Sequence, residues 1–397
     1  MAVLRSSICG APVVLASATP SLESWANAEA GKYSKIELTS RFGEAVMPRM
    51  GTIDMRTEAL PASRWVSDEL RKRVQRRLDL GEQSLLFINR RGYAPITMCR
   101  ACGHQIGCDN CDSRLVEHRF QKRLVCHQCG ESKPIPSQCP SCEAEDRLAP
   151  IGPGVERLAE EAMALFPDAR VAVLSSDRFG SARALKAEIE AIAAGGCDII
   201  IGTQLVAKGH NFPLLTLVGV IDADLGLHGS DLRAAERTFQ LMRQVSGRAG
   251  RAETAGEAVM QTYQPEHPVI RAILAGDEEG FWKAEAAQRE AAGMPPFGRL
   301  AGIVLSGSDA HQVMELGMAL ARNDAAVRAV GAQVFGPAPA PIARVRGRHR
   351  VRLLVKAAKG VALQAALAEW VGVPAIACTG RVSMGRYPNW GPWARRG

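Results

Sequence analysis

Several absences limit the classes of protein to which this 397-residue sequence can belong. It contains no run of about 18 apolar residues, so we expect no transmembrane helix. Its opening residues lack the layout of a secretory signal peptide. It also lacks a GxxxxGK(S/T) phosphate loop and an acidic DExH box on an apolar strand. A complete phosphate-loop nucleotide site is therefore excluded for this sequence by itself.

Cysteines, by contrast, are concentrated in one short stretch. Eight of the 11 cysteines form four CxxC pairs, and each pair can direct two sulfurs at the same cation. Tetrahedral zinc needs two such pairs, so the pattern predicts two four-cysteine zinc sites with no ligand left over. An iron–sulfur cluster is the alternative, and disulfides are disfavoured by this spacing. The pairs are Cys99/Cys102, Cys108/Cys111, Cys126/Cys129 and Cys139/Cys142.

The pairs can share two ions in two ways. A sequential scheme joins the first pair to the second and the third to the fourth. The gap between Cys102 and Cys108 is tight for two CxxC turns that face one ion, so the spacing favours a nested scheme. The nested scheme has an outer set of Cys99, Cys102, Cys139 and Cys142 and an inner set of Cys108, Cys111, Cys126 and Cys129.

The charge balance favours an anionic partner. The net charge is +8 and the isoelectric point is near 9.0, which makes nucleic acid the first candidate. A basic protein without such a partner is the alternative. Cys9, Cys197 and Cys378 stand outside the CxxC pairs, and together with thiolate zinc sites they indicate a reducing cytoplasm.

Apolar runs and helical stripes alternate along most of the chain. This alternation predicts an α/β fold, in which helices cover both faces of a parallel sheet. Residues 40–63 are rich in turn signals and are expected to form a linker. The predicted strands are 13–16, 85–88, 171–174, 198–201 and 216–221, and the predicted helices begin near 21 or cover 65–78, 154–165, 182–194 and 234–246.

Two segments carry residues suited to phosphate chemistry. In QVSGRAGR, Arg248 and Arg251 stand three residues apart beside glycines. Two guanidinium groups held in this way suit the charge that develops during phosphoryl transfer, and a basic surface turn is the alternative. The segment GTQLVAKGH, residues 202–210, follows a predicted strand, where ligands gather in open α/β sheets.

Towards the C-terminus, five arginines alternate with other residues. No acidic residue interrupts 338–359 and aromatic residues are scarce there, which suits a phosphate backbone rather than base stacking. A continuous strand would place all five on one face, whereas a hairpin turn at Gly347 would divide them between two strands. A charged edge strand without a ligand is the alternative. The arginines are Arg344, Arg346, Arg348, Arg350 and Arg352.

Together these segments resemble the PriA family of bacterial replication-restart DNA helicases, in helicase superfamily 2. The resemblance rests on SATPSLES, LLFINRRGY, the four CxxC pairs, GTQLVAKGHNFP and QVSGRAGR, which occur in this order. It implies the nested zinc pairing, a RecA-like helicase lobe and a C-terminal domain that binds DNA near a fork. It also implies roles for three sets of residues. Ser17, Ala18 and Thr19 match the motif that couples the ATP state to the grip on DNA; Gly202, Thr203, Lys208 and Gly209 match a motif at the nucleotide and DNA face of the second lobe; and Gln244, Arg248 and Arg251 match the motif that reaches the γ-phosphate.

The resemblance also predicts how the chain is divided. We expect residues 1–40 to be a remnant of the first helicase lobe, 41–80 a linker and helix, and 81–267 the second lobe with a zinc-binding insertion at 97–148. Residues 268–397 are expected to form an α+β DNA-binding domain, with an atypical tail from 378 onward. In the family, the phosphate loop, the DExH box and an N-terminal DNA-binding domain precede the point where this sequence begins. We therefore expect the chain to be the C-terminal portion of a longer protein.

The expected function is that of an ATP-dependent DNA helicase in replication restart and primosome assembly, with 3′ to 5′ unwinding. The complete enzyme is expected to use ATP, Mg²⁺ and two Zn²⁺, with the zinc module acting as a rigid wedge or protein contact. Expected partners are forked and single-stranded DNA, primosome proteins and single-stranded-DNA-binding protein, in the nucleoid and not at a membrane. The alternatives are a non-enzymatic zinc-containing fragment that binds DNA or primosome proteins, and a fragment without function.

Overall fold

The largest part of the computed structural model is a six-stranded sheet in the order β1-β11-β10-β2-β9-β8. Every pair of neighbouring strands in it is parallel. The structure describes residues 2–38, 48–58, 60–61, 64–89, 96–99, 102, 104, 106–110, 115–118, 123–126, 131–145, 148–151, 154–175, 179, 181–203, 206, 212–227, 232–250 and 256–372. The strands are β1 (Arg49–Asp54), β2 (Gln83–Phe87), β8 (Val171–Leu174), β9 (Ile199–Gly202), β10 (Leu215–Val220) and β11 (Glu257–Thr262).

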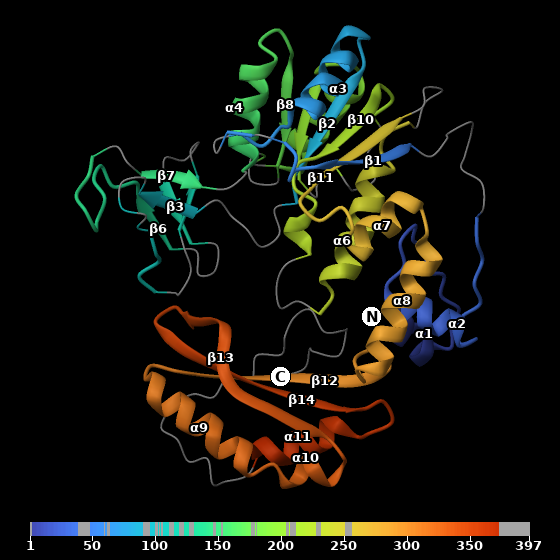
Figure 1. Cartoon of the computed structure of the whole chain (residues 1–397). Helices are drawn as coiled ribbons and strands as arrows, with labels where there is room; N and C mark the ends of the chain where they lie inside the picture. Colours follow the sequence, from blue (N-terminus) through green and yellow to red (C-terminus); the bar gives the residue numbers. More distant parts are fainter. Residues whose placement is uncertain are drawn as a thin grey trace.

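Helices cover both faces of this sheet (Figure 1). Alternate strand residues point to opposite faces, so Leu86 packs in one core with α3 and α4, while Leu85 and Phe87 pack in the other core with α6, α7 and α8. Both cores are apolar, which explains why β2, β9 and β10 are buried along their whole length. The helices are α2 (Leu22–Glu29), α3 (Asp68–Asp79), α4 (Val155–Leu165), α5 (Ala182–Ala193), α6 (Ala234–Ser246), α7 (Pro268–Ala275) and α8 (Glu278–Ala291), preceded by the exposed α1 (Ala2–Cys9).

The predicted α/β class is confirmed, but two segments differ from the sequence prediction. Arg49–Asp54, expected within a linker, is the edge strand β1, which pairs with β11. Its burial is mixed along its length, so no alternation marked it as a strand. Residues 13–16, expected to be a buried strand, form neither a strand nor a buried segment, and Val14 is 90% exposed. The prediction was wrong because none of the described strands pairs with these apolar residues.

A second, smaller sheet lies between β2 and α4 in the sequence and to one side of the central sheet in space (Figure 1). Its order is β6-β5-β4-β3-β7, and all of its pairs are antiparallel. The small core of this cysteine-rich module contains Ile106, Cys108, Leu115, Leu124 and Cys126. The strands are β3 (Ile96–Cys99), β4 (Val116–His118), β5 (Arg123–Val125), β6 (Ser132–Pro134) and β7 (Leu148–Ile151).

The third sheet is three-stranded and antiparallel, in the order β12-β14-β13. Three helices pack on one face, which is the face turned away from the central sheet in Figure 1. The preceding helices α7 and α8, which the sequence assigned to this C-terminal domain, share the core of the central sheet instead. The elements are β12 (Gly298–Gly307), α9 (Ala310–Arg322), α10 (Ala325–Ala329), β13 (Gln333–Val345), β14 (Arg348–Ala358) and α11 (Leu363–Gly372).

Among the described residues, no helix has both the length and the apolar character needed to cross a bilayer. The atypical tail from 378 onward lies outside the described residues.

Candidate functional site: cysteine cluster, helix α6 and arginine hairpin

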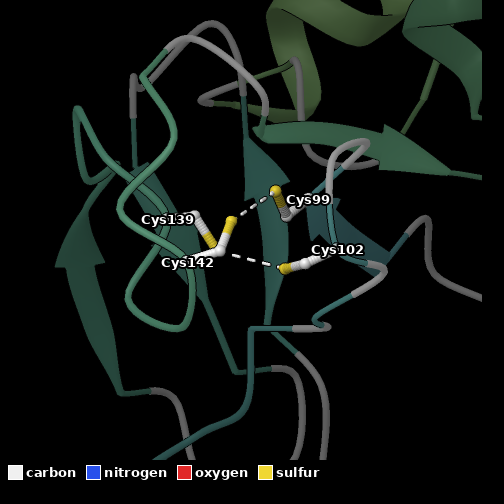
Figure 2. A group of neighbouring side chains, drawn as sticks. All are labelled: Cys99, Cys102, Cys139 and Cys142. Atoms are coloured by element: carbon white, nitrogen blue, oxygen red, sulfur yellow. Dashed lines mark hydrogen bonds between the residues drawn. The ribbon is translucent and has the colours of Figure 1, made fainter.

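Four cysteines converge in the cysteine-rich module (Figure 2). The Cys99 and Cys142 sulfurs are 3.7 Å apart, and so are those of Cys102 and Cys139. All four sulfurs lie within 4.8 Å of one another. Zinc–thiolate bonds of about 2.3 Å in a tetrahedron require sulfur separations of about 3.8 Å, whereas a disulfide needs about 2.0 Å. The geometry therefore suits a four-thiolate zinc ion, and these cysteines are the outer set of the nested scheme.

Backbone hydrogen bonds shape the turns that present these sulfurs. Cys99 N–H donates to the His104 carbonyl at 2.8 Å, and Cys139 N–H donates to the Ala144 carbonyl at 3.0 Å. Ser141 N–H donates to Cys139 Sγ at 3.4 Å. These hydrogen bonds fix the backbone from which the Cys99 and Cys139 sulfurs project.

The inner set is only partly within the described residues. Cys108 and Cys126 are buried in the core of the module, while Cys111 and Cys129 lie outside the described residues. Cys126 N–H donates to the Glu131 carbonyl at 2.8 Å, which repeats the five-residue spacing seen at Cys99 and Cys139. Cys108 Sγ donates to Glu131 Oε2 at 2.8 Å. Cys126 thus makes the same backbone hydrogen bond as Cys99 and Cys139 of the outer set.

Helix α6 holds the segment that follows Ser17. Gln244 Nε2 donates to Thr19 Oγ1 at 2.8 Å, and Gln240 Nε2 donates to the Pro20 carbonyl at 2.7 Å. One helical turn further back, Glu236 Oε1 accepts from Leu22 N–H at 3.2 Å. These three side chains are spaced by four residues, so they form one stripe along the helix. Ser17 contributes as well, because its Oγ accepts from Thr19 N–H at 3.1 Å.

The start of α6 is joined to α8 through buried charges. Glu236 is 2% exposed, and its carboxylate lies 3.1 Å from Arg289 Nη2. The same guanidinium lies 2.7 Å from Glu285 and also donates to the Leu232 carbonyl at 3.1 Å. Burial raises the pKa of Glu236 above the ordinary glutamate value, although Arg233 and Arg289 favour its charged form.

The remaining nucleotide candidates lie at the ends of a strand and a helix. Gly202 ends β9, and Thr203 follows it in a buried position. A Cβ at Gly202 would lie 2.5 Å from Val206 Cγ1, so the close approach of Val206 requires glycine there. Arg248 follows α6 and is buried, at 7% exposure. Lys208, Gly209 and Arg251 lie outside the described residues.

The arginine-rich segment is a hairpin, which is the second of the two arrangements that the sequence left open. Val345 pairs with Arg348, and Arg346 and Gly347 form the turn between them with φ of 50° and 73°. Gly347 enters this left-handed region without strain whereas Arg346 does so at a steric cost, so the glycine is the residue that favours a turn here. Arg344 is on β13, while Arg348, Arg350 and Arg352 are on β14.

Three of the arginines share one face of β14. Val351 and Leu353 point into the core beneath the sheet, so Arg348, Arg350 and Arg352 point to the opposite face. The sequence analysis did not identify two further residues on that face, Lys356 and Phe335. Lys356 continues the same alternation, and its Nζ lies 6.0 Å from the centre of the Phe335 ring. Phe335 is 47% exposed and joins the face through pairing with Leu354, a contact that only the fold supplies.

The sequence analysis identified Gln244 as a functional residue of helix α6, but it did not identify Glu236 or Gln240 on the same helix. Glu236 and Gln240 stand at helical spacing from Gln244 in the sequence, which was the available signal. Their partners lie more than 200 positions away, so no local pattern identified them.

Two family models match the chain. The PriA DNA helicase Cys-rich region domain matches residues 108–134, and the Primosomal protein N C-terminal domain matches residues 290–384. The first lies in the cysteine-rich module, and the second begins at the end of α8 and includes β12, β13 and β14.

Several curated proteins named Replication restart protein PriA are similar to most of this chain. The one from Rickettsia felis is 42% identical over 372 residues, which is 94% of this chain and 57% of that protein. The Bacillus subtilis protein is 39% identical over 368 residues, or 92% of this chain and 46% of that protein. The Haemophilus influenzae protein is 37% identical over 370 residues, or 93% of this chain and 50% of that protein. The chain thus spans about half the length of these relatives.

Among solved structures, Saccharomyces cerevisiae Dbp5 bound to RNA and ADP BeF3 is 13% identical, covering 68% of this chain and 49% of that one. The TM-score is 0.34.

Proposed function

The chain belongs to the PriA family of replication restart proteins, and we propose that it supplies the second helicase lobe, the zinc module and the C-terminal DNA-binding domain of an ATP-dependent DNA helicase. The observation that carries this proposal is the 42% identity to a Replication restart protein PriA over 94% of the chain. The reaction proposed for the complete enzyme is ATP hydrolysis coupled to 3′ to 5′ unwinding of forked DNA, in replication restart and primosome assembly. The proposed protein partners are primosome proteins and single-stranded-DNA-binding protein.

In this function, Arg248 and Arg251 approach the γ-phosphate, where guanidinium groups stabilise the charge that develops on the transferred oxygens. Gln244 lies on the same segment and orients it. Gly202, Thr203, Lys208 and Gly209 contact the nucleotide or DNA at the end of β9. The chain has no phosphate loop, so in the complete enzyme that element comes from sequence outside this chain. Mg²⁺ bound with ATP neutralises phosphate charge.

Ser17 and Thr19 are proposed to report the nucleotide state. The Gln244–Thr19 hydrogen bond of 2.8 Å supports this role, because it joins the proposed arginine-finger segment to the segment that follows Ser17. A displacement of α6 relative to this segment would lengthen this bond. The same shift would pass through Gln240 and Glu236 to residues 20–22.

The proposed DNA contact is the face of β14 that carries Arg348, Arg350, Arg352 and Lys356, with Arg344 and Arg346 at its hairpin end. Guanidinium groups bind phosphate oxygens, and the affinity of such a surface falls steeply with salt. Phe335 beside Lys356 adds one exposed ring on which a base can stack.

Two zinc ions are proposed for the cysteine-rich module. Cys99, Cys102, Cys139 and Cys142 would hold one, and Cys108, Cys111, Cys126 and Cys129 would hold the other. Four thiolate ligands leave no open position, so these ions would stabilise the fold of the module and take no part in bond cleavage.

A second candidate function is a non-enzymatic protein that binds DNA and zinc. The absence of a phosphate loop from the sequence favours this reading for the chain acting alone. Both candidates share the DNA-binding and zinc-binding parts, so turnover of ATP distinguishes them.

The experiment is ATP hydrolysis by the purified 397-residue chain, with and without forked DNA, alongside a DNA-binding measurement on the same sample. We expect DNA binding without turnover. The helicase reading then requires turnover once a phosphate-loop segment from a relative is fused ahead of the chain, and loss of that turnover in R248A. Failure of the fused protein to hydrolyse ATP, with DNA binding retained, would favour the non-enzymatic reading. Turnover by the unfused chain would overturn the assignment of the missing element.

A further inference from the structure

The tip of the arginine hairpin lies against the cysteine-rich module. Gly347 N–H donates to the Asn110 carbonyl at 2.5 Å, and Val345 packs against the apolar core that contains Cys108 and Cys126. In Figure 1 the end of β13 approaches the side of the module that carries β6. Two parts of the chain that are more than 200 positions apart are therefore in direct contact.

The geometry of the turn explains why Gly347 can make this contact. Arg346 and Gly347 are both left-handed, with φ of 50° and 73°, and they connect the paired residues Val345 and Arg348. In a two-residue turn of this kind, the N–H of the second central residue lies outside the hydrogen-bond ladder of the hairpin. The Gly347 N–H is thus directed at the module, and it donates to Asn110.

The acceptor belongs to a proposed metal-binding turn. Asn110 lies between Cys108 and Cys111 in one CxxC pair of the inner set. Asn110 Nδ2 donates to Glu131 Oε2 at 3.0 Å, which holds the Asn110 side chain against the following segment. The carbonyl that receives the hairpin is therefore held by the same turn that presents Cys108.

We propose that zinc at the inner site docks the arginine hairpin onto the cysteine-rich module, so that metal loading sets the position of Arg344, Arg346 and Arg348 towards DNA. This inference rests on the proposed function for the inner zinc site. The ion orders the CxxC turn and thereby places the Asn110 carbonyl and the apolar surface for Val345. Four thiolates on one Zn²⁺ leave a net negative charge, which complements the arginines on both sides of Gly347.

The coupling is reciprocal. If the ion stabilises the docked hairpin, the docked hairpin stabilises the bound ion by the same factor. Weakening the hairpin contact therefore accelerates loss of the inner ion without changing any ligand. The outer ion should be unaffected, because the docked residues contact the turn of the inner set.

The test measures zinc release into a chromogenic chelator from the wild-type chain, V345S and the control V334S. Both valines are half-buried on β13, but Val334 packs in the core beneath the three-stranded sheet. We expect two ions per chain, with one ion released from V345S about fivefold faster, as expected for the loss of part of one apolar side-chain contact. V334S should release both ions at the wild-type rates. V345A serves in place of V345S if the serine variant does not fold.

Amide hydrogen exchange provides a readout from the hairpin itself. The Gly347 amide should be protected in the zinc-loaded chain and exchange at least about tenfold faster after chelation, because its acceptor is lost. The amide of Leu353, in the middle of β14, should be unchanged.

The outcomes separate two failures. A chain that binds only one zinc ion contradicts the proposed inner site, and with it the proposal. A chain that binds two ions, releases them equally from V345S and wild type, and keeps Gly347 protected after chelation overturns the docking inference while leaving both zinc sites intact.

Discussion

Thr19 connects the segment that follows Ser17 to helix α6. Its hydroxyl accepts from Gln244 across 225 positions of sequence, and its amide donates to Ser17. The residue is 7% exposed, so its hydroxyl has little access to water. Losing the bond would leave a partly buried amide group without its partner, and such losses are costly.

We expect T19V to lower the free energy of unfolding by about 1 kcal/mol, since valine keeps the shape and removes the acceptor for Gln244. Urea unfolding measures the change. Thr57 provides the matched control, because its hydroxyl donates to the Asp54 carbonyl at 2.8 Å at an exposed position. T57V should change stability by less than about 0.5 kcal/mol. Equal effects of the two substitutions would show that the Gln244 bond adds nothing.

The proposed outer zinc site predicts that replacing two buried cysteines, Cys99 and Cys197, has different effects on the zinc content. C99S should remove one zinc ion per chain and expose the module to proteolysis, because a structural zinc ion contributes folding free energy directly. Cys197 is also buried, and burial raises the pKa of its thiol to about 11, but it stands outside the CxxC pairs. C197S should keep the full zinc content. Metal analysis checks both, and an unchanged zinc content in C99S would contradict the outer site.

At the scale of the element, α6 is the connecting part. It carries the stripe of Glu236, Gln240 and Gln244 on one side and stacks Phe239 on Phe281 of α8, with ring centres 4.0 Å apart. The span of this helix could be predicted from the sequence, because apolar residues recur at helical spacing. Its contacts could not, because spacing says which residues share a face but not what packs against that face. For strand β1, by contrast, even the secondary structure could not be predicted from the sequence. Its residues form a strand because they pair with the parallel strand β11, and this pairing is not visible in the local sequence.

Glu236 gives α6 a dependence on pH. Because burial raises the pKa of this carboxyl above 4.5, the native state binds its proton more readily than the unfolded state does. Its contribution to stability is therefore complete at low pH and is lost as the pH rises through the raised pKa. The variant E236Q lacks this titration. The free energy of unfolding of wild type relative to E236Q should rise as the pH is lowered from 7 towards 5.

Urea unfolding at several pH values measures this difference, and comparison at each pH cancels proton uptake by the cysteines. Glu190 is a suitable control, because it is 67% exposed beside Lys186 on α5. E190Q should stay within about 0.5 kcal/mol of wild type throughout. A flat difference for E236Q would mean that the Glu236 carboxyl titrates alike in the folded and unfolded chains.

At the scale of the whole molecule, the basic residues are placed unevenly. The sheet β12-β14-β13 buries one face under helices, and the arginines of β14 occupy the other. The sequence predicted the cluster of arginines but left its geometry open, because the choice between a strand and a hairpin depended on the conformation of Gly347.

This asymmetry predicts a difference in salt dependence. The double variant R350A/R352A should weaken binding to single-stranded DNA and reduce the slope of log K against log salt by about 0.7 for each lost phosphate contact. Arg328 provides the control, because it is on α10 and pairs with Asp324 at 2.8 Å. R328A should leave affinity and slope unchanged. The same slope in all three proteins would exclude this face of β14 as the DNA-binding surface.

The pairing of β3 with β7 has a consequence for how the cysteine-rich module relates to the rest of the chain. Ile96, near its start, is paired with Ile151, near its end, so the chain enters and leaves the module at one place. The central sheet contains none of the strands of the module. In evolutionary terms, a single point of entry and exit suits a module that is gained, lost or exchanged as one block.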